Sequence, residues 1–206
     1  MAFSWMYRYV GGHFRRRRRD WVADEFHGCH SVVDLGGTVE SWIGERFPNI
    51  TVVNVKPSKG DLPTGFSYLQ ADACDSQLPG GFDLAFSNSA IEHVGTLDRQ
   101  RQFADEMRRL GRRLCCQTPN RWFPVEPHYL GLFVHWLPPS FFGHFLHRWL
   151  TVQGLAGRPS VAESRTIRQG EAIRFLTRRE LRELFPGCQL RTERFLGWPK
   201  SFIVWR

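Results

Sequence analysis

The chain has 206 residues, and 42% of them are hydrophobic, which suits one domain with a packed core. Its five cysteines include no Cys-x-x-Cys pair and no zinc-finger spacing with histidine, which argues against a disulfide framework and a structural zinc site. The net charge of +8 is compatible with a nucleic-acid or anionic partner, but nearly all of it comes from arginine, which a genome's base composition explains equally well.

Residues 1–30 are expected to form an N-terminal helical segment. They lack the apolar region of a secretory signal, so a cytoplasmic protein is expected. The run Arg15–Arg19 cannot lie on a single helix face, so some of these side chains must point to solvent. We interpret the run as a solvated helix beside the core. Contact with an anionic substrate or nucleic acid is the alternative.

From residue 31 onward, strand and helix patterns alternate. Strands are predicted at 31–35, 50–55, 66–70, 82–87, 112–117, near 188–195 and at 201–206; helices are predicted at 39–47, 98–110 and 177–185. Such alternation is typical of a doubly wound, mostly parallel sheet. We therefore expect an α/β fold, with residues 1–206 forming a single domain.

The alternation stops over residues 119–175, which are rich in aromatic residues and proline. From Pro127 to His147 there is no charged side chain apart from histidine, but the Pro138-Pro139 pair and the histidines argue against a membrane span. We expect no transmembrane segment here. Instead, we interpret 119–175 as a helical insertion that covers an acceptor site at the open edge of the sheet.

The first predicted strand ends in the sequence Asp34-Leu35-Gly36-Gly37. Two glycines allow the backbone to approach a ligand closely, and the N-terminus of a following helix would favour negative charge. Asp34 would suit a cation at the same place. A ligand that carries both an amino acid and a positive charge, such as S-adenosylmethionine, meets these demands.

Three segments resemble the class I S-adenosylmethionine-dependent methyltransferases of the type-11 group. They are "VVDLGGT", "YLQADACDSQLPGGFDLAFSNSAIEHVG" and "TPNRWFPVEPHY", and they cover most of residues 31–130 in the family's order. The resemblance implies a Rossmann-like, seven-stranded sheet with an antiparallel last strand. It also implies S-adenosylmethionine as the cofactor.

The resemblance assigns cofactor roles residue by residue. Gly36 and Gly37 would pass under the methionine moiety, and Asp34 would support its amino group. Where the family carries an acid for the ribose hydroxyls, this chain has Asn54, an amide that can still bond a hydroxyl. After the predicted strand 66–70, Asp72 and Ala73 would occupy the position that contacts the adenine. After the predicted strand 82–87, Asn88 would face the transferring methyl group.

The residues after strand four constrain the acceptor. Asn88-Ser89-Ala90-Ile91 differs from the Asn-Pro-Pro-Tyr of amide and adenine N-methyltransferases. Glu92-His93 matches part of the Glu-x-x-Glu-His motif that binds Mg²⁺ in metal-assisted O-methyltransferases, although Ser89 replaces its first acid. Glu92 and His93 are therefore candidate Mg²⁺ ligands, with helix capping or pocket lining as the alternative.

A sugar or alcohol hydroxyl hardly ionises near pH 7, so its methylation needs a base or a metal. The insertion contains His128, His135, His144 and His147, whose side-chain type titrates near neutrality. We favour His144 as the catalytic base, with His93 as the second candidate.

The predicted activity is O-methylation of a hydroxyl on a saccharide or small polar metabolite, with Trp122, Trp136 or Trp149 as stacking faces for a sugar. Three alternatives remain: a Mg²⁺-dependent methyltransferase of RNA ribose, a methyltransferase of a lipid or quinone, and a binding module that has lost its cofactor. The sequence does not indicate the oligomeric state.

Overall fold

The computed structural model describes residues 2–44, 46–58, 60–126, 131–132 and 173–206. The chain divides into two compact units, Met1–Val22 with Phe123–Ala172, and Ala23–Trp122 with Ile173–Arg206. The second unit contains the main sheet and all the residues of the candidate site that the structure describes.

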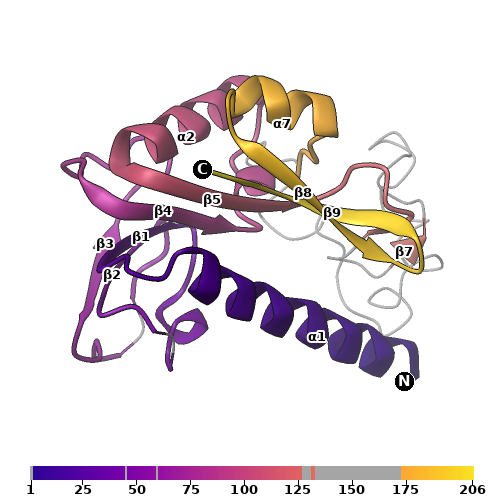
Figure 1. The fold of residues 1–206 in the computed structure, drawn as a ribbon, viewed down its shortest axis with the longest axis horizontal. Helices are drawn as coiled ribbons and strands as arrows, with labels where there is room; N and C mark the ends of the chain where they lie inside the picture. Colours follow the sequence, from indigo (N-terminus) through magenta and orange to yellow (C-terminus); the bar gives the residue numbers. More distant parts are fainter. Residues whose placement is uncertain (1, 45, 59, 127–130, 133–172) are drawn as a thin grey trace. The chain divides into compact units, whose positions relative to one another are not determined.

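Seven strands form the sheet of this unit (Figure 1). In chain order they are β1 (Ser31–Leu35), β2 (Asn49–Asn54), β3 (Phe66–Gln70), β4 (Phe82–Asn88), β5 (Gly111–Pro119), β8 (Gln189–Phe195) and β9 (Trp198–Trp205). All seven were predicted, and the boundaries of β1 and β3 agree with the prediction to the residue. The β-branched and aromatic residues in these segments favour a pleated, half-buried backbone.

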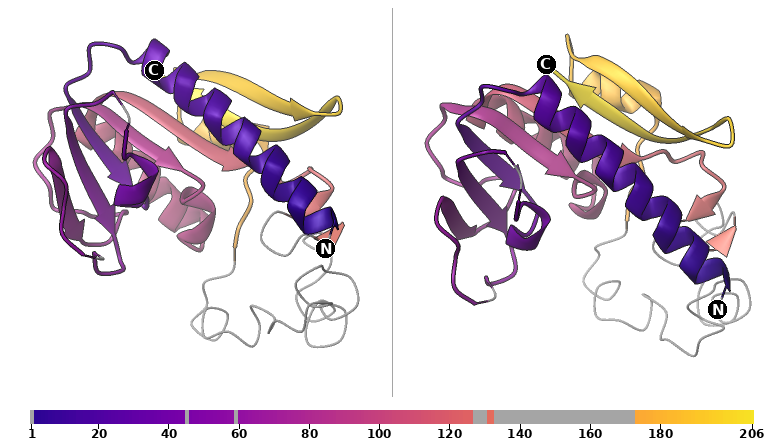
Figure 2. Two further views of the ribbon diagram at one scale, coloured as in Figure 1. Left: turned by 90° about the horizontal axis from the view of Figure 1, so that it is seen from below. Right: turned by 60° about the horizontal axis from the view of Figure 1, so that its bottom comes forward.

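The strand order is β3-β2-β1-β4-β5-β9-β8. The first five strands of this order form four parallel pairs, while β9 runs antiparallel to both β5 and β8. Figure 2 shows from two further directions that β8 and β9 form a long hairpin along the edge of the sheet. The expected Rossmann-like, mostly parallel sheet with an antiparallel last strand is therefore confirmed.

Two helices cover one face of the sheet, α2 (Leu97–Leu110) and α7 (Arg178–Leu184) (Figure 1). Both begin at a threonine whose hydroxyl accepts a hydrogen bond from a backbone N–H of the first turn, and Thr177 and Glu180 complete a capping box. Such caps satisfy helix donors that would otherwise lack partners.

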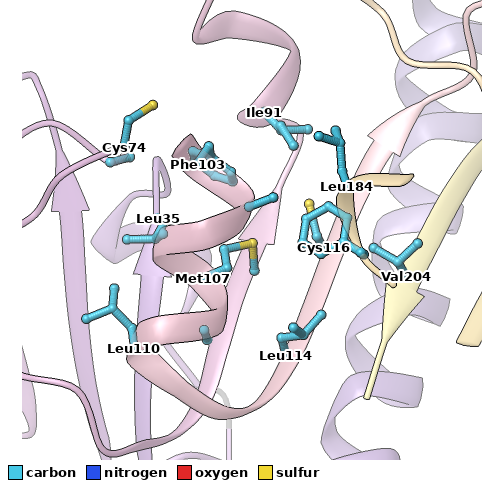
Figure 3. Close-up of a cluster of buried hydrophobic side chains, with 14 of the residues drawn as sticks. Leu35, Cys74, Ile91, Phe103, Met107, Leu110, Leu114, Cys116, Leu184 and Val204 are labelled. Atoms are coloured by element: carbon cyan, nitrogen blue, oxygen red, sulfur yellow. The ribbon is translucent and has the colours of Figure 1, made fainter. Parts of the chain in front are cut away.

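The hydrophobic core lies between these helices and the sheet (Figure 3). On α2 the side chains of Phe103, Met107 and Leu110 follow the three-to-four-residue spacing of one helix face, and all three are fully buried. Cys116 of β5 packs in the same cluster, and all five cysteines are free thiols. Both Cys115 and Cys116 of β5 are fully buried.

The prediction of a helix at 39–47 is wrong. Of the residues that the structure describes in this range, only Val39–Ser41 is helical, as a short 3₁₀ turn labelled η1, and Gly44 has a φ of +84° that ends any continuation. Trp42 and Phe47 are buried, whereas Ile43 is 60% exposed. Tertiary contacts of Trp42 therefore outweigh the helical spacing of the apolar residues.

The other unit contains most of α1 (Ala2–Glu25), whose C-terminal end belongs to the sheet unit. In the arginine run, Arg15, Arg16, Arg17 and Arg19 are exposed and Arg18 is buried. Two short strands, β6 (Val125–Glu126) and β7 (Gly131–Leu132), pair antiparallel. Most of the 119–175 insertion, with its expected helices, lies outside the described residues.

At the end of α1, Phe26 is fully buried and lies under the guanidinium of Arg113, which is 4.4 Å from the ring centroid. Arg113 also donates a hydrogen bond to the backbone oxygen of Glu25. These contacts fix the end of the helix against β5.

None of the helices in the described ranges combines the length and apolarity needed to cross a bilayer.

Candidate functional site

The sheet reverses its strand order between β1 and β4, and ligands of open α/β sheets bind outside the carboxyl ends of strands at such a point. Gly36 follows β1 here with a φ of +84°, and its N–H donates to the backbone oxygen of Val53 at 2.8 Å. A Cβ atom on Gly36 would lie 2.5 Å from the Cβ of Ala90, beyond β4. The glycine thus lets the turns after β1 and β4 touch.

Asp34 lies beneath the glycine turn and is 1% exposed. Its Oδ2 accepts a hydrogen bond of 2.6 Å from Nε1 of Trp42, and a Cβ atom on Gly37 would lie 1.7 Å from the same oxygen. The other oxygen, Oδ1, is buried and receives no hydrogen bond from any part of the chain that the structure describes. A buried polar atom without a partner is costly, and it is the feature expected of a group that meets a ligand.

Burial raises the pKa of Asp34 from 3.8 to about 7, and the hydrogen bond from Trp42 opposes this rise only partly. The charged form is disfavoured because no cation or further donor in the described residues compensates for lost hydration. A ligand cation placed at Oδ1 would reverse that preference.

Trp42 belongs to the site although the sequence analysis did not assign it. Its ring packs edge-to-face on Phe86 of β4, with centroids 4.9 Å apart, and on Phe47. An indole N–H needs an acceptor when it is buried, and Asp34 supplies that acceptor. No signal in the sequence singles out this pairing, because Glu40 is the acid nearer to Trp42 in the chain.

The helix N-terminus expected to follow the glycine turn is absent from this structure. The segment η1 has only three residues, so it has no appreciable macrodipole to attract a carboxylate. Any attraction for an anion must come from individual backbone N–H groups instead.

Asn54, at the end of β2, uses its amide on the glycine turn. Nδ2 donates to the backbone oxygens of Gly37 at 2.9 Å and Gly36 at 3.3 Å, while Oδ1 accepts from the N–H of Lys56 at 3.0 Å. Both ends of the side chain are therefore engaged by backbone.

Asp72, after β3, holds the start of the next loop. Its carboxylate accepts from the N–H of Cys74 at 2.9 Å and pairs with Arg99 of α2. Burial alone would raise the pKa of Asp72, but these two partners outweigh it and lower the pKa. Ala73 is buried beside it. The adenine contact assigned to this pair stays a prediction.

Asn88 is the last residue of β4, and the next residue, Ser89, has a φ of +55°. Such a backbone is unfavourable for serine, and strained residues of this kind cluster at functional sites. Gln117 of β5 holds Ser89 at two points, because its backbone oxygen accepts from the Ser89 N–H and its Oε1 accepts from the hydroxyl. The strain thus lies directly after Asn88, whose contact with the transferring methyl group stays a prediction.

Glu92 and His93 lie on the short 3₁₀ turn η2 (Ile91–His93). Glu92 is fully buried and accepts a hydrogen bond of 3.0 Å from Thr118, whereas His93 is exposed. Among the described residues, no group of three or more His, Cys, Asp or Glu side chains could hold a metal ion. The pair alone does not fit a Mg²⁺ site, so that prediction would need ligands from outside the described ranges.

The residues predicted to act on the acceptor lie mainly outside the described structure. This is true of His144, the other three histidines of the insertion, Trp136 and Trp149. Trp122 is described: it is 58% exposed beyond β5, and the guanidinium of Arg121 lies 5.6 Å from its ring centroid. An exposed aromatic face is thus present near the carboxyl ends of the strands.

No protein-family model matches the chain, and no curated protein matches it. Solved structures do match its fold. The amino pentose methyltransferase CalS10 of Micromonospora echinaspora is 16% identical with a TM-score of 0.57, and 96% of each chain is covered.

Two further solved structures match the fold of this chain. A 1,6-didemethyltoxoflavin-N1-methyltransferase from Burkholderia thailandensis is 12% identical with a TM-score of 0.57, over 93% of this chain and 76% of that one. The N-methyltransferase NodS of Bradyrhizobium japonicum is 10% identical with a TM-score of 0.54, over 93% and 94%. Strand order, the glycine turn and these likenesses agree: the chain has the fold of the class I S-adenosylmethionine-dependent methyltransferases.

Proposed function

We propose that this protein is an S-adenosylmethionine-dependent methyltransferase. The observation that carries the proposal is the turn at the switch point, where a buried Asp34 keeps one oxygen without a partner in the described structure beneath Gly36 and Gly37. The matching solved structures support the cofactor, since CalS10 and NodS contain S-adenosylmethionine and S-adenosylhomocysteine respectively.

In this proposal the cofactor supplies a methyl group that is already activated on a sulfonium. The residues of the chain position the cofactor and the acceptor. Asp34 supports the amino group of the methionine moiety, Gly36 and Gly37 keep the approach open, and Asn88 faces the methyl group from the end of β4. Holding the nucleophile in line with the methyl group is the main catalytic contribution that such a site can make.

The proposed acceptor is a hydroxyl of a saccharide or small polar metabolite. The exposed ring of Trp122 is a suitable stacking face for a sugar, and one matching structure is an amino pentose methyltransferase. N-Methyltransferases also match the fold, so the methylated atom has to be tested directly. The mechanism that we propose uses a histidine base, since Glu92 and His93 would need further Mg²⁺ ligands from outside the described residues.

The test is methyl transfer from labelled S-adenosylmethionine to a panel of saccharides, amino sugars and an RNA oligonucleotide, with Mg²⁺ and again with EDTA. We expect label on a saccharide oxygen, located by mass spectrometry, at equal rates in both conditions. Label on the amine of an amino sugar would correct the methylated atom. Label on RNA that EDTA abolishes would replace this function with the metal-dependent alternative.

We also propose that His144 is the base that removes the hydroxyl proton. We expect His144→Ala to lower turnover about 100-fold, which is typical of a lost general base, with little change in cofactor affinity. Steady-state kinetics with calorimetric titration separates the two quantities, and His147→Ala is the matched control. Full activity of His144→Ala would move the role to another residue, first to His93.

A further inference from the structure

The amide of Asn54 has one orientation that satisfies its surroundings. Two carbonyl oxygens, those of Gly36 and Gly37, face Nδ2, and an N–H group, that of Lys56, faces Oδ1. Turning the amide over would set oxygen against two oxygens and NH₂ against N–H. A carboxylate here would face the same two carbonyl oxygens without a proton to donate. The turn therefore selects asparagine where the family carries an acid.

These hydrogen bonds determine where the next N–H groups point. In a trans peptide the carbonyl oxygen and the following N–H project in opposite directions, and the described chain has no cis peptide. Because the oxygens of Gly36 and Gly37 point to Asn54, the N–H groups of Gly37 and Thr38 point away from it. Neither N–H donates a hydrogen bond within the described ranges. Successive N–H groups that point the same way can hold an anion.

We propose that Asn54 is a positioning residue of the cofactor turn and not a ligand of the ribose. Its amide holds the N–H groups of Gly37 and Thr38 toward the carboxylate of the amino acid end of the cofactor. This inference rests on the proposed function. It gives the turn an anion-binding feature that the three-residue segment η1 cannot supply.

Two substitutions at Asn54 separate this role from a ribose contact, with affinity for S-adenosylhomocysteine measured by calorimetric titration. Asn54→Ala should weaken binding about tenfold, because the turn loses the bonds that order it. Asn54→Asp should weaken binding at least as much, since its carboxylate faces two carbonyl oxygens. A ribose ligand would behave in the opposite way: an acid bonds hydroxyls more strongly than an amide does, so Asn54→Asp would tighten binding.

The 2′-deoxyribose analogue of S-adenosylhomocysteine provides a second readout, which a loss of stability alone does not change. The ratio of affinities for the two ligands should be the same in the wild type and in Asn54→Ala, because the substitution and the missing hydroxyl act at separate places. A ratio that falls to one in Asn54→Ala would assign the ribose to Asn54 and overturn the inference.

Lys56→Ala is the matched control, because Lys56 reaches Asn54 through its backbone N–H and its exposed side chain should be dispensable. Circular dichroism checks that each variant is folded. If Asn54→Ala is unfolded, Asn54→Ser replaces it: its hydroxyl can donate one bond, so a smaller loss with the same ratio is expected. A wild type that binds neither ligand would reject the proposed function itself, whereas tighter binding by Asn54→Asp would reject only this inference.

Discussion

Gly37→Ala should destabilise the protein by about 3 kcal/mol, the sum of a forced shift in a packed site and a lost buried hydrogen bond. The new methyl group would lie 1.7 Å from Oδ2 of Asp34, a distance that two atoms cannot share. Asp34 cannot turn aside without breaking its 2.6 Å bond to Trp42, which is itself packed against Phe86. Either the carboxyl or the turn must move, so affinity for the cofactor should fall as well. Urea denaturation and titration with S-adenosylhomocysteine measure the two effects.

A double-mutant cycle identifies the cause of this loss. In an Asp34→Ala background the clashing carboxyl is gone, so Gly37→Ala should cost less than about 1 kcal/mol there. Gly44→Ala is the control for backbone strain alone: Gly44 has the left-handed φ of +84° with nothing within 4 Å of its Cβ position, and about 1 kcal/mol is expected. An equal cost of Gly37→Ala in both backgrounds would contradict the contact with Asp34.

Asp34→Asn should make the protein more stable above neutral pH and leave it nearly unchanged below about pH 4, where Asp34 is largely protonated in the folded and the unfolded chain alike. The pKa of Asp34 is about 7 in the folded chain and 3.8 when it is exposed, so the folded state binds more protons between these values. Stability therefore decreases as the pH rises through this window and levels off above it. At about 1.4 kcal/mol for each pH unit, the whole effect approaches about 4 kcal/mol.

Thermal unfolding of the wild type and Asp34→Asn at about pH 4 and pH 8 tests this. The difference in melting temperature should be small at pH 4 and large at pH 8, and Asp61→Asn, in an exposed loop, should show none at either pH. Cofactor affinity should fall, because the single amide oxygen would accept from Trp42. The NH₂ would then replace Oδ1, and an NH₂ cannot accept a bond from the cofactor's amino group. A difference that is equal at both pH values would show that Asp34 is not buried as an acid.

The fold could be predicted because its strands carry their own signals. Val32, Val33 and Leu35 in β1 and the β-branched run of β2 favour strands whatever surrounds them, and the spacing of Phe103, Met107 and Leu110 predicts one buried helix face. The prediction of a helix at 39–47 failed because it rested on the local spacing of apolar residues. The contact between Trp42 and Asp34 joins two different elements and outweighs that spacing.

The sequence predicted where the candidate site lies in the fold better than it predicted the contacts of the site residues. The glycine turn, Asp34, Asn54, Asp72 and Asn88 all lie at the carboxyl ends of β1 to β4, since these ends meet at one edge of a parallel sheet. The partners of Asn54 could not be inferred, because they are backbone groups, which every residue type carries. The pairing of Asp72 with Arg99 likewise depends on how α2 packs.

Calorimetric titration of the wild-type protein with S-adenosylhomocysteine tests the central claim most directly. We expect one site per chain with a dissociation constant in the micromolar range, and release of protons near pH 7 as the cofactor's amino group drives Asp34 to ionise. Comparing the binding enthalpy in two buffers of different ionisation enthalpy measures that release. Absence of binding would contradict the account, and the turn after β1 would then belong to a protein that has kept the fold without the cofactor.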